Sequence, residues 1–316
     1  MTDPTVRELA RLIEESSGFV IQESRYEALA DFAAARLKAS RHADLAAYVA
    51  FLDQHRESEE WRRVVNQITI KESYLFRGPA QLDAIRNHIL PWLVDRRTDR
   101  TLRIWSAGCA RGEEAATLAV ILADQPELAG WSWSILATDV DETALAEARR
   151  GLYGRRAVSG VSDEVLERYF EPRGDAFELD PDLRRRITYR RLNLAAAPLM
   201  VGEGPFDLVL LRNVLIYFRP DTQRRVVAEV ERLLLPDGFV FLGPSESLLH
   251  IESRLVAQDL GGSFCYRSAE RRHPTESPSA AGADEEPRAP AAHRTVPGPA
   301  TVSASPPDEA VEDRLE

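Results

Sequence analysis

The sequence is poor in the features that mark several large classes of protein. Its 316 residues include two cysteines, Cys109 and Cys265. Their spacing suits neither a metal site nor a disulfide framework, so we expect reduced thiols and no bound metal. The chain has no run of roughly 18 apolar residues and no charged and then apolar leader, which predicts a cytoplasmic protein that does not insert into a membrane. A net charge of −11 argues against nucleic-acid binding, which needs a dominant basic face.

The sequence also lacks the two glycine-rich fingerprints that bind phosphate. Residues 102–107 form an apolar run, Gly108 to Gly112 form a small-residue turn, and a helical pattern follows at once. This order predicts the opening unit of a nucleotide-type α/β fold. The turn reads G-x-x-x-G, however, and Glu113 and Glu114 stand where a phosphate would otherwise bind. Acidic side chains at a helix N-terminus favour a positively charged ligand, such as S-adenosylmethionine with its ammonium and sulfonium groups.

Apolar residues at helical spacing predict an all-helical domain over residues 1–95. The first helix is expected to end at Gly18. Ser24 and Glu27 are expected to form a capping box at the start of the second helix, and Ser58 to cap the fourth.

Strand and helix patterns alternate over residues 96–268, which predicts a mostly parallel, doubly wound sheet. The apolar run 206–211 is expected to be a central strand. The helix after it is expected to cover 221–235 and to end at the Pro-Asp-Gly that follows. Residues around 153–186 interrupt the alternation, which predicts a small inserted subdomain with one plausible strand at 176–179. The other predicted strands cover 102–107, 131–138, 187–194 and 239–242, with a closing hairpin at 255–258 and 263–267.

The last segment, residues 269–316, has a different composition. It holds 8 of the 19 prolines and almost no large apolar side chains. Such a segment cannot bury enough surface to offset its chain entropy, so we expect it to be disordered.

Polar side chains that follow the predicted strands are candidates for a ligand site, because ligands of open α/β sheets bind beyond the carboxyl ends of the strands. Asp139 is expected to hydrogen-bond a ribose diol, and Asp141 to cap the next helix; alternatively, both are caps. Arg212 could bind a carboxylate through two hydrogen bonds, and Asn213 offers both a donor and an acceptor. Tyr217 could supply a hydroxyl group at the reacting centre, or could be a core tyrosine.

Six motifs in order resemble those of the CheR-type chemotaxis receptor glutamate O-methyltransferases, over about residues 5 to 267. They are TIKESYLFR (69–77), RIWSAGCARGEE (103–114), LATDVDETALAEARRGLY (136–153), RLNL (191–194), GPFDLVLLRNVLIYF (204–218) and LLLPDGFVFLGPSESL (233–248). The resemblance implies a small all-α domain followed by a class I, Rossmann-like methyltransferase domain. It further implies a shared site for S-adenosylmethionine, S-adenosylhomocysteine as the product, and acceptor glutamates on the cytoplasmic helical bundle of chemoreceptors.

The resemblance also implies the cofactor-binding residues. Ser73, Arg77 and Glu114 would contact the methionine end of the cofactor, Asp139 would hold the ribose, and the Asn-Leu pair of the RLNL motif would flank the adenine. The full set is Lys71, Ser73, Arg77, Gly108, Glu114, Asp139, Asn193, Leu194, Arg212 and Asn213.

Arg212 and Tyr217 match residues that the family places near the transferred methyl group, and they are the implied catalytic residues. A glutamate acceptor is already ionised at neutral pH, so no general base is required. Arg212 would orient the acceptor, and the enzyme would align the carboxylate oxygen with the methyl group and exclude water.

The chain departs from the family pattern at several positions. Lys71 stands where many members have Asn, Ser73 stands where many have Thr, and Leu75 replaces the first of two usual Phe. Ala115-Ala116-Thr117 replaces a frequent Pro-Tyr-Ser. A cation near the sulfonium would weaken cofactor binding unless Glu72 or Glu114 offsets it. These departures leave two alternatives open, which are a binding module without turnover and a methyltransferase of this fold with another substrate.

The resemblance leads to two expectations about partners. Residues 168–193 resemble a small β subdomain that docks a C-terminal receptor pentapeptide in some members, but here they show no clear glycine-rich hairpin. We therefore predict an enzyme that does not depend on that pentapeptide, and that is a monomer.

Overall fold

Four helices open the chain in the computed structural model, which describes residues 3–69, 71–196, 198–199 and 204–268. They are α1 (Pro4–Ser17), α2 (Tyr26–Ala39), α3 (Leu45–Gln54) and α4 (Glu59–Ile68). Gly18 ends α1 in the left-handed conformation, and Ser58 accepts a hydrogen bond from the Trp61 N–H at the start of α4, as predicted. No helix of the described residues is long and apolar enough to cross a membrane. The predicted disorder of 269–316 concerns residues outside the described part of the chain.

The capping box expected at Ser24 is wrong. Ser24 lies inside a short 3₁₀ helix, Glu23–Arg25, which runs directly into α2. The chain is therefore already helical at Ser24, so no N-cap position exists there, and α2 begins without a side-chain cap.

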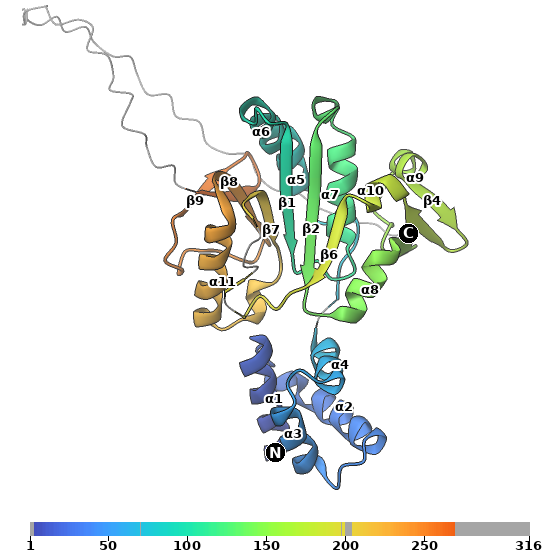
Figure 1. The fold of residues 1–316 in the computed structure, drawn as a ribbon, viewed down its shortest axis with the longest axis vertical. Coiled ribbons are helices and arrows are strands. Elements are labelled where there is room, and N and C mark those ends of the chain that lie inside the picture. Colours follow the sequence, from blue (N-terminus) through green and yellow to red (C-terminus); the bar gives the residue numbers. More distant parts are fainter. Residues whose placement is uncertain (1–2, 70, 197, 200–203, 269–316) are drawn as a thin grey trace, which may run out of the picture. The chain divides into compact units, whose positions relative to one another are not determined.

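A seven-stranded sheet follows, in the order β6-β2-β1-β7-β8-β10-β9 (Figure 1). The first five strands in this order are parallel, and the last two form an antiparallel hairpin. β7 is central, and all six of its residues are buried, as predicted. The strands are β1 (Thr101–Ala107), β2 (Ser132–Asp139), β6 (Ile187–Arg191), β7 (Phe206–Leu211), β8 (Leu234–Leu242), β9 (Leu255–Asp259) and β10 (Phe264–Ser268).

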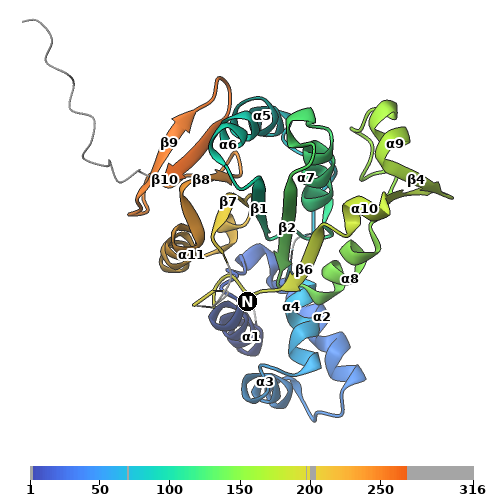
Figure 2. The ribbon, with the colours of Figure 1, turned by 45° about the horizontal axis from the view of Figure 1, so that its top comes forward.

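Helices cover both faces of this sheet, which confirms the doubly wound fold (Figure 2). One face packs against α5 (Pro79–Ala84), α6 (Leu90–Arg96) and α7 (Glu113–Ala123), and a π-helical turn, Ile85–Ile89, joins α5 to α6. The other face packs against α11 (Pro220–Leu233). α8 (Glu142–Arg150) connects β2 to the inserted subdomain.

The predicted boundary between α11 and β8 is wrong. The helix ends at Leu233, and β8 already begins at Leu234, where it pairs with Phe206. The register then shifts between Phe206 and Leu208, and this irregularity accommodates the Pro-Asp-Gly segment within the strand. Gly238 also allows a close approach, because a Cβ there would lie 2.8 Å from the Leu234 side chain.

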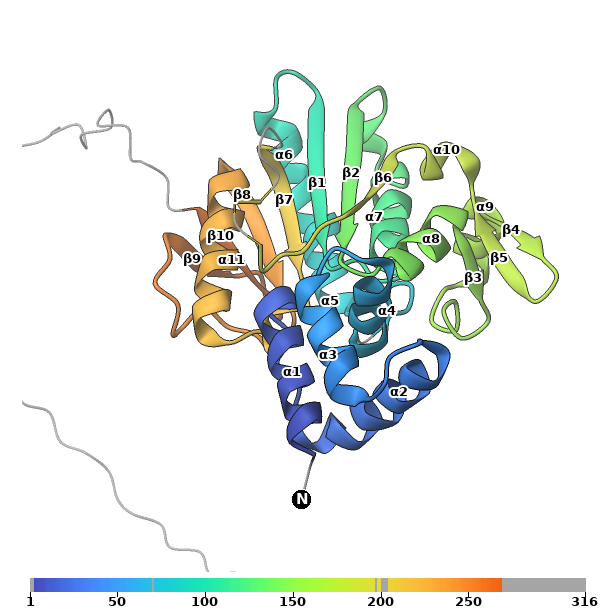
Figure 3. The same cartoon turned by 60° about the horizontal axis from the view of Figure 1, so that its bottom comes forward.

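The inserted subdomain contains more structure than the single strand predicted from the sequence. It is an antiparallel sheet in the order β3-β5-β4, formed by β3 (Leu152–Gly154), β4 (Phe170–Arg173) and β5 (Ala176–Leu179). α9 (Asp163–Tyr169) and α10 (Pro181–Arg184) complete it (Figure 3). Gly174, with φ 62°, makes the turn between β4 and β5, so a hairpin exists after all. Its strands are too short for their alternation to stand out in the sequence.

Candidate functional site

Two adjoining cavities lie at the carboxyl ends of the parallel strands. The first encloses about 760 Å³ and the second about 560 Å³, and they share Gly108, Ala110, Asn213 and Tyr217. The structure brings together all the residues that the sequence predicts for the site. Those that line one or both cavities are Lys71, Ser73, Arg77, Gly108, Glu114, Asp139, Asn193, Leu194, Arg212, Asn213 and Tyr217.

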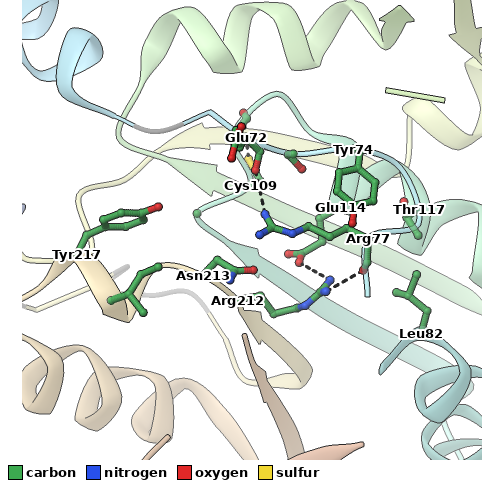
Figure 4. A pocket seen from close by; sticks show the side chains of 14 residues that line it. Glu72, Tyr74, Arg77, Leu82, Cys109, Glu114, Thr117, Arg212, Asn213 and Tyr217 are labelled. Atoms are coloured by element: carbon green, nitrogen blue, oxygen red, sulfur yellow. Dashed lines mark hydrogen bonds and ion pairs between the residues drawn. The ribbon is translucent and has the colours of Figure 1, made fainter. Parts of the chain in front are cut away.

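The first cavity, which we call the polar cavity, is organised around a buried ion pair (Figure 4). Arg212 Nη1 donates to Glu114 at 3.2 Å, and the Ser106 hydroxyl donates to the other oxygen of Glu114 at 2.7 Å. Burial raises the pKa of Glu114, and the charge of Arg212 opposes this shift. Arg212 Nη2 donates to the backbone oxygen of Arg77 at 2.7 Å, while its Nε is buried without a partner among the described residues. The guanidinium group is thus largely engaged within the protein.

The segment between α4 and α5 lies against this cavity as a linker whose described residues form no helix or strand. Phe76 has φ 59°, and its N–H donates to the Thr117 hydroxyl at 2.9 Å. Arg77 Nη1 donates to the backbone oxygen of Glu72 at 2.9 Å. Gly78 allows the close approach of Arg212, since a Cβ there would overlap the guanidinium group. The linker is therefore held in one conformation by contacts on both sides.

The second cavity, which we call the apolar cavity, has one buried carboxylate in its wall. Asp139 accepts hydrogen bonds from the N–H groups of Ala110 at 2.8 Å and Asp141 at 2.9 Å. Burial raises the pKa of Asp139, and these N–H groups oppose the shift. The remaining walls are mostly apolar, and they include Phe19, Val140, Leu192, Leu194 and Phe218.

Asp141 caps α8, as predicted, and it also determines the surroundings of Lys71. Its carboxylate accepts from the N–H groups of Thr143 and Ala144, and from the Thr69 hydroxyl at 2.8 Å. Lys71 Nζ lies 2.6 Å from the same, fully buried carboxylate. Asp141 therefore neutralises the charge of Lys71. Glu72 or Glu114 was expected in this role, and neither is the partner observed.

The departure at Ala115-Ala116-Thr117 divides between the core and the site. Ala115 and Ala116 are completely buried in the core between α7 and the sheet, and neither lines the polar cavity or the apolar cavity. Thr117 lines the polar cavity, and its hydroxyl accepts a hydrogen bond from the Phe76 N–H.

The sequence did not identify the contacts that fix Tyr217. The Val20 N–H donates to the Tyr217 carbonyl oxygen at 2.8 Å, and the rings of Phe19 and Tyr217 lie 5.8 Å apart. Asn193 Nδ2 donates to the backbone oxygen of Ser16 at 2.8 Å. The end of α1 thus forms part of the site, and no local pattern marks it because its partners lie about 200 positions along the chain. Burial raises the pKa of the Tyr217 phenol, which therefore keeps its proton.

Glu246 is a second residue that the sequence did not single out. Its carboxylate accepts hydrogen bonds from four backbone N–H groups, at 2.6 to 3.2 Å. They belong to Gly243, Asn213, Val214 and Ile216. Asn213 has φ 58°, a conformation that an asparagine tolerates better than most residues. Glu246 thereby fixes the loop that carries Arg212, Asn213 and Tyr217.

The chemistry of the two cavities fits S-adenosylmethionine. An apolar cavity with a single carboxylate suits a nucleoside, whose base is flat and whose ribose donates hydrogen bonds. The polar cavity presents side chains of both signs, which suits an amino acid group. Gly108, with φ 82°, lines both cavities, and a Cβ there would overlap Val214. Gly108 therefore packs directly against Val214 where the two cavities adjoin, and a side chain there would displace Val214.

Comparison with known proteins agrees with this site. The sequence model described as "CheR methyltransferase, SAM binding domain" matches residues 71–259. The chemotaxis protein methyltransferase of Escherichia coli (strain K12) is 31% identical over 262 residues, which cover 81% of this chain and 88% of that protein. Chemotaxis protein methyltransferase 2 of Vibrio cholerae is 31% identical over 220 residues, which cover 69% of this chain and 76% of that protein.

A third relative has a different name. The probable biofilm formation methyltransferase WspC of Pseudomonas aeruginosa is 31% identical over 223 residues, which cover 67% of this chain and 53% of that protein. The family match spans six of the seven strands of the sheet, the linker from Lys71 onward and most of both cavities. The chain therefore belongs to the CheR family of S-adenosylmethionine-dependent methyltransferases.

Proposed function

We propose that this enzyme transfers the methyl group of S-adenosylmethionine to glutamate side chains on the cytoplasmic helical bundle of chemoreceptors, giving glutamate methyl esters and S-adenosylhomocysteine. The names of the relatives from Escherichia coli and Vibrio cholerae support a chemotaxis substrate. The proposal implies a cytoplasmic enzyme, because that is where such a bundle lies, and we propose that it acts as a monomer.

The observation that carries the carboxylate acceptor is that no buried and unpaired base of the described chain lines the cavities. Glu72, which also lines the polar cavity, is exposed to solvent. Among the described residues no histidine lines either cavity. Burial and the nearby Asp139 and Glu114 raise the pKa of Cys109 well above its usual value, so its thiol stays protonated. Glu114 is bound to Arg212, and Asp139 to two backbone N–H groups. An amine or alcohol acceptor would need one of these groups to remove a proton, whereas a glutamate arrives already ionised.

The chain's own residues would bind and orient the two reactants. Asp139 would accept hydrogen bonds from the ribose, the apolar cavity would enclose the base, and Glu114 and Ser73 would contact the amino acid end. When bound, the cofactor supplies an electrophilic methyl group on a sulfonium. Arg77 lines the polar cavity with only a backbone partner, so its guanidinium group is available to attract a carboxylate.

Tyr217 and Arg212 would act at the reacting centre in different ways. Tyr217 lines both cavities and keeps its proton, so its hydroxyl group can donate a hydrogen bond to an acceptor oxygen. The contacts of Arg212 favour a positioning role, because its Nη groups hold Glu114 and the Arg77 carbonyl. The catalytic role that the sequence suggests for Arg212 stays a prediction. Moderate rather than tight binding of the acceptor carboxylate favours methyl transfer, because the carboxylate loses its charge as the ester forms.

The direct test is methyl transfer to receptor cytoplasmic fragments with cofactor labelled in the methyl group. Base treatment of a methyl ester releases volatile labelled methanol, whereas a methylated amine is stable to base. We expect volatile label from the wild type, its loss in Tyr217→Phe with cofactor affinity retained, and loss of cofactor binding in Asp139→Ala. Cofactor binding by calorimetry without any transfer would instead support the non-catalytic binding module.

The structure removes much of the reason for that alternative. It rested on Lys71 and on Ala115-Ala116, but Lys71 is paired with Asp141 and the alanines are buried in the core. A non-receptor substrate is the remaining alternative, and the name of the Pseudomonas aeruginosa relative is the observation that favours it. Peptide mass mapping of methylated candidates distinguishes the two.

Independence from a receptor pentapeptide now needs a different argument, because the hairpin thought to be missing is present. We propose this independence because of the composition of β4, which is an outer strand of the small sheet. β4 has four residues, and one of them is Pro172, which has no N–H to donate to an added strand. Tight binding of an isolated receptor tail peptide in calorimetry would contradict this proposal.

A further inference from the structure

A third depression adjoins the polar cavity and opens toward the inserted subdomain. We call it the side groove. It lies between the linker residues 71–77, the loop at Arg111 and the turn 154–159, and it encloses about 1410 Å³. Glu72, Ser73, Tyr74 and Arg77 line both the side groove and the polar cavity. A molecule bound in the side groove can therefore place one side chain into the polar cavity.

The side groove is built into the fold by contacts across its floor. The Leu75 N–H donates to the Ala157 carbonyl oxygen at 2.9 Å, which joins the linker to the turn of the inserted subdomain. Ser73 lies beside Glu113 at the start of α7. Val158 is buried in the main core, so the turn cannot move away without disrupting that core.

The side groove carries cationic side chains in a chain that is acidic overall. Its lining contains four of them, Lys71, Arg77, Arg111 and Arg156, and two acidic side chains, Glu72 and Glu113. The whole chain has a net charge of −11. Burial raises the pKa of Glu113.

Two of the four cations remain available for an external partner. Lys71 is bound to Asp141, and Arg111 to Glu147 at 2.9 Å. Within the described part of the chain, the one hydrogen bond of the Arg77 side chain goes to a backbone oxygen. Arg156 is exposed, and its side chain makes no ion pair or hydrogen bond with the described residues. Tyr74, 46% exposed, lies at the junction with the polar cavity and offers an apolar surface beside these charges.

We propose that the side groove binds the receptor helix that carries the acceptor glutamate, and that it selects an acidic, amphipathic helix. This inference rests on the proposed function. The acceptor carboxylate enters the polar cavity beside Arg77, an apolar side chain contacts Tyr74, and a second acidic side chain pairs with Arg156. Residues three or four apart share a helix face, so this second acid belongs one or two turns from the acceptor.

The test is charge reversal at Arg156 with a matched control. Arg155 is the neighbouring residue; it is exposed, pairs with the exposed Asp175 and does not line the side groove. Arg156→Glu and Arg155→Glu change the net charge equally, so a difference between them reports position. With a receptor cytoplasmic fragment at low salt, we expect Arg156→Glu to raise KM on the order of 10-fold with little change in kcat, as lost electrostatic pairing predicts.

Two further readouts separate this effect from damage to the fold. The difference should shrink as salt is added, because exposed charges are screened. Cofactor affinity by calorimetry should equal that of the wild type in both variants. Arg155→Glu should leave KM within about twofold, the usual range for an exposed charge away from a binding surface.

The possible failures are distinguishable. A wild type that binds cofactor but transfers no methyl group to receptor fragments would contradict the proposed function itself. A wild type that methylates the fragments, with Arg156→Glu and Arg155→Glu equal in KM, would overturn the side groove as the acceptor site. A KM effect of Arg156→Glu that persists unchanged at high salt would also overturn it.

Discussion

Replacing Glu246 by Gln tests how the site loop is held. One carboxylate oxygen accepts from the N–H groups of Gly243 and Asn213, and the other from Val214 and Ile216. Glutamine keeps one oxygen but replaces the second by an NH₂ group, which itself only donates. Two of the four backbone N–H groups therefore lose their acceptor, and the two that remain bond to a neutral oxygen.

The expected loss of stability follows from these contacts. A hydrogen bond to a charged group contributes about 1.5 to 3 kcal/mol. Glu246 is partly exposed, so water can replace part of each lost bond, and we expect the free energy of unfolding to fall by about 2 to 3 kcal/mol. For a protein of this size each kcal/mol shifts Tm by about 2 to 4 °C, which predicts a Tm lower by about 4 to 12 °C.

The rate of methyl transfer should also fall in this variant, because Asn213 adopts its left-handed conformation between two of these hydrogen bonds. Relaxation of the loop would displace Arg212 and Tyr217 together. We expect a larger loss in kcat than in cofactor affinity, since Asp139 and the apolar cavity stay in place. Thermal melting, the base-released methanol assay and calorimetry measure the three quantities.

Glu252→Gln is the matched control, because Glu252 is exposed and changes charge in the same way. It should melt within about 1 °C of the wild type, as surface substitutions usually do. If Glu246→Gln also melts there and keeps its kcat, the four hydrogen bonds do not hold the loop and the reasoning is refuted.

Three other changes test separate parts of the site. Burial raises the pKa of Asp139, so this carboxylate takes up a proton at a higher pH than an exposed aspartate does, and cofactor affinity should fall as the pH is lowered through this pKa. The fall should be smaller in Asp139→Asn, where Glu114, whose pKa burial also raises, still titrates; calorimetry across pH checks both proteins. Gly108→Ala should weaken cofactor binding at least 10-fold and lower Tm, because its φ is 82° and its Cβ would overlap Val214, which lines the apolar cavity. Normal binding would mean that the close contact of Gly108 with Val214 does not shape the site. Lys71→Met leaves the Asp141 carboxylate without its cation, so it should lower the free energy of unfolding by about 1 to 3 kcal/mol. Cofactor affinity should not improve; tighter binding would mean that Lys71 does repel the sulfonium.

Features that depend on neighbouring residues could be predicted from the sequence. The caps at Gly18, Ser58 and Asp141 and the buried central strand β7 follow from local patterns, and the structure confirms them. The residues expected at the site also lie together, because the carboxyl ends of parallel strands meet at one edge of a sheet.

Features that depend on distant partners could not be predicted. In the sequence, Glu246 has no feature that distinguishes it from other loop glutamates. Its role becomes visible only in the fold, where the end of β8 lies beside the loop after β7. Phe19 reads as the residue after a helix until α1 ends beside Tyr217. The β4-β5 hairpin was missed because four-residue strands give too few alternating positions. Arg212 was expected to bind the acceptor, because the sequence does not show that Arg212 already forms an ion pair with Glu114.

The two glutamates that follow Gly112 show how neighbouring residues can serve different sites. Successive side chains on a helix point about 100° apart, so Glu113 and Glu114 cannot face the same cavity. Glu114 lines the polar cavity and binds Arg212, whereas Glu113 lines the side groove beside Ser73. The start of α7 therefore faces the linker at two points, with Glu113 beside Ser73 and Glu114 joined through Arg212 to the Arg77 carbonyl. In the proposed enzyme, this arrangement links the position of Arg77 to both the cofactor end and the acceptor end of the site.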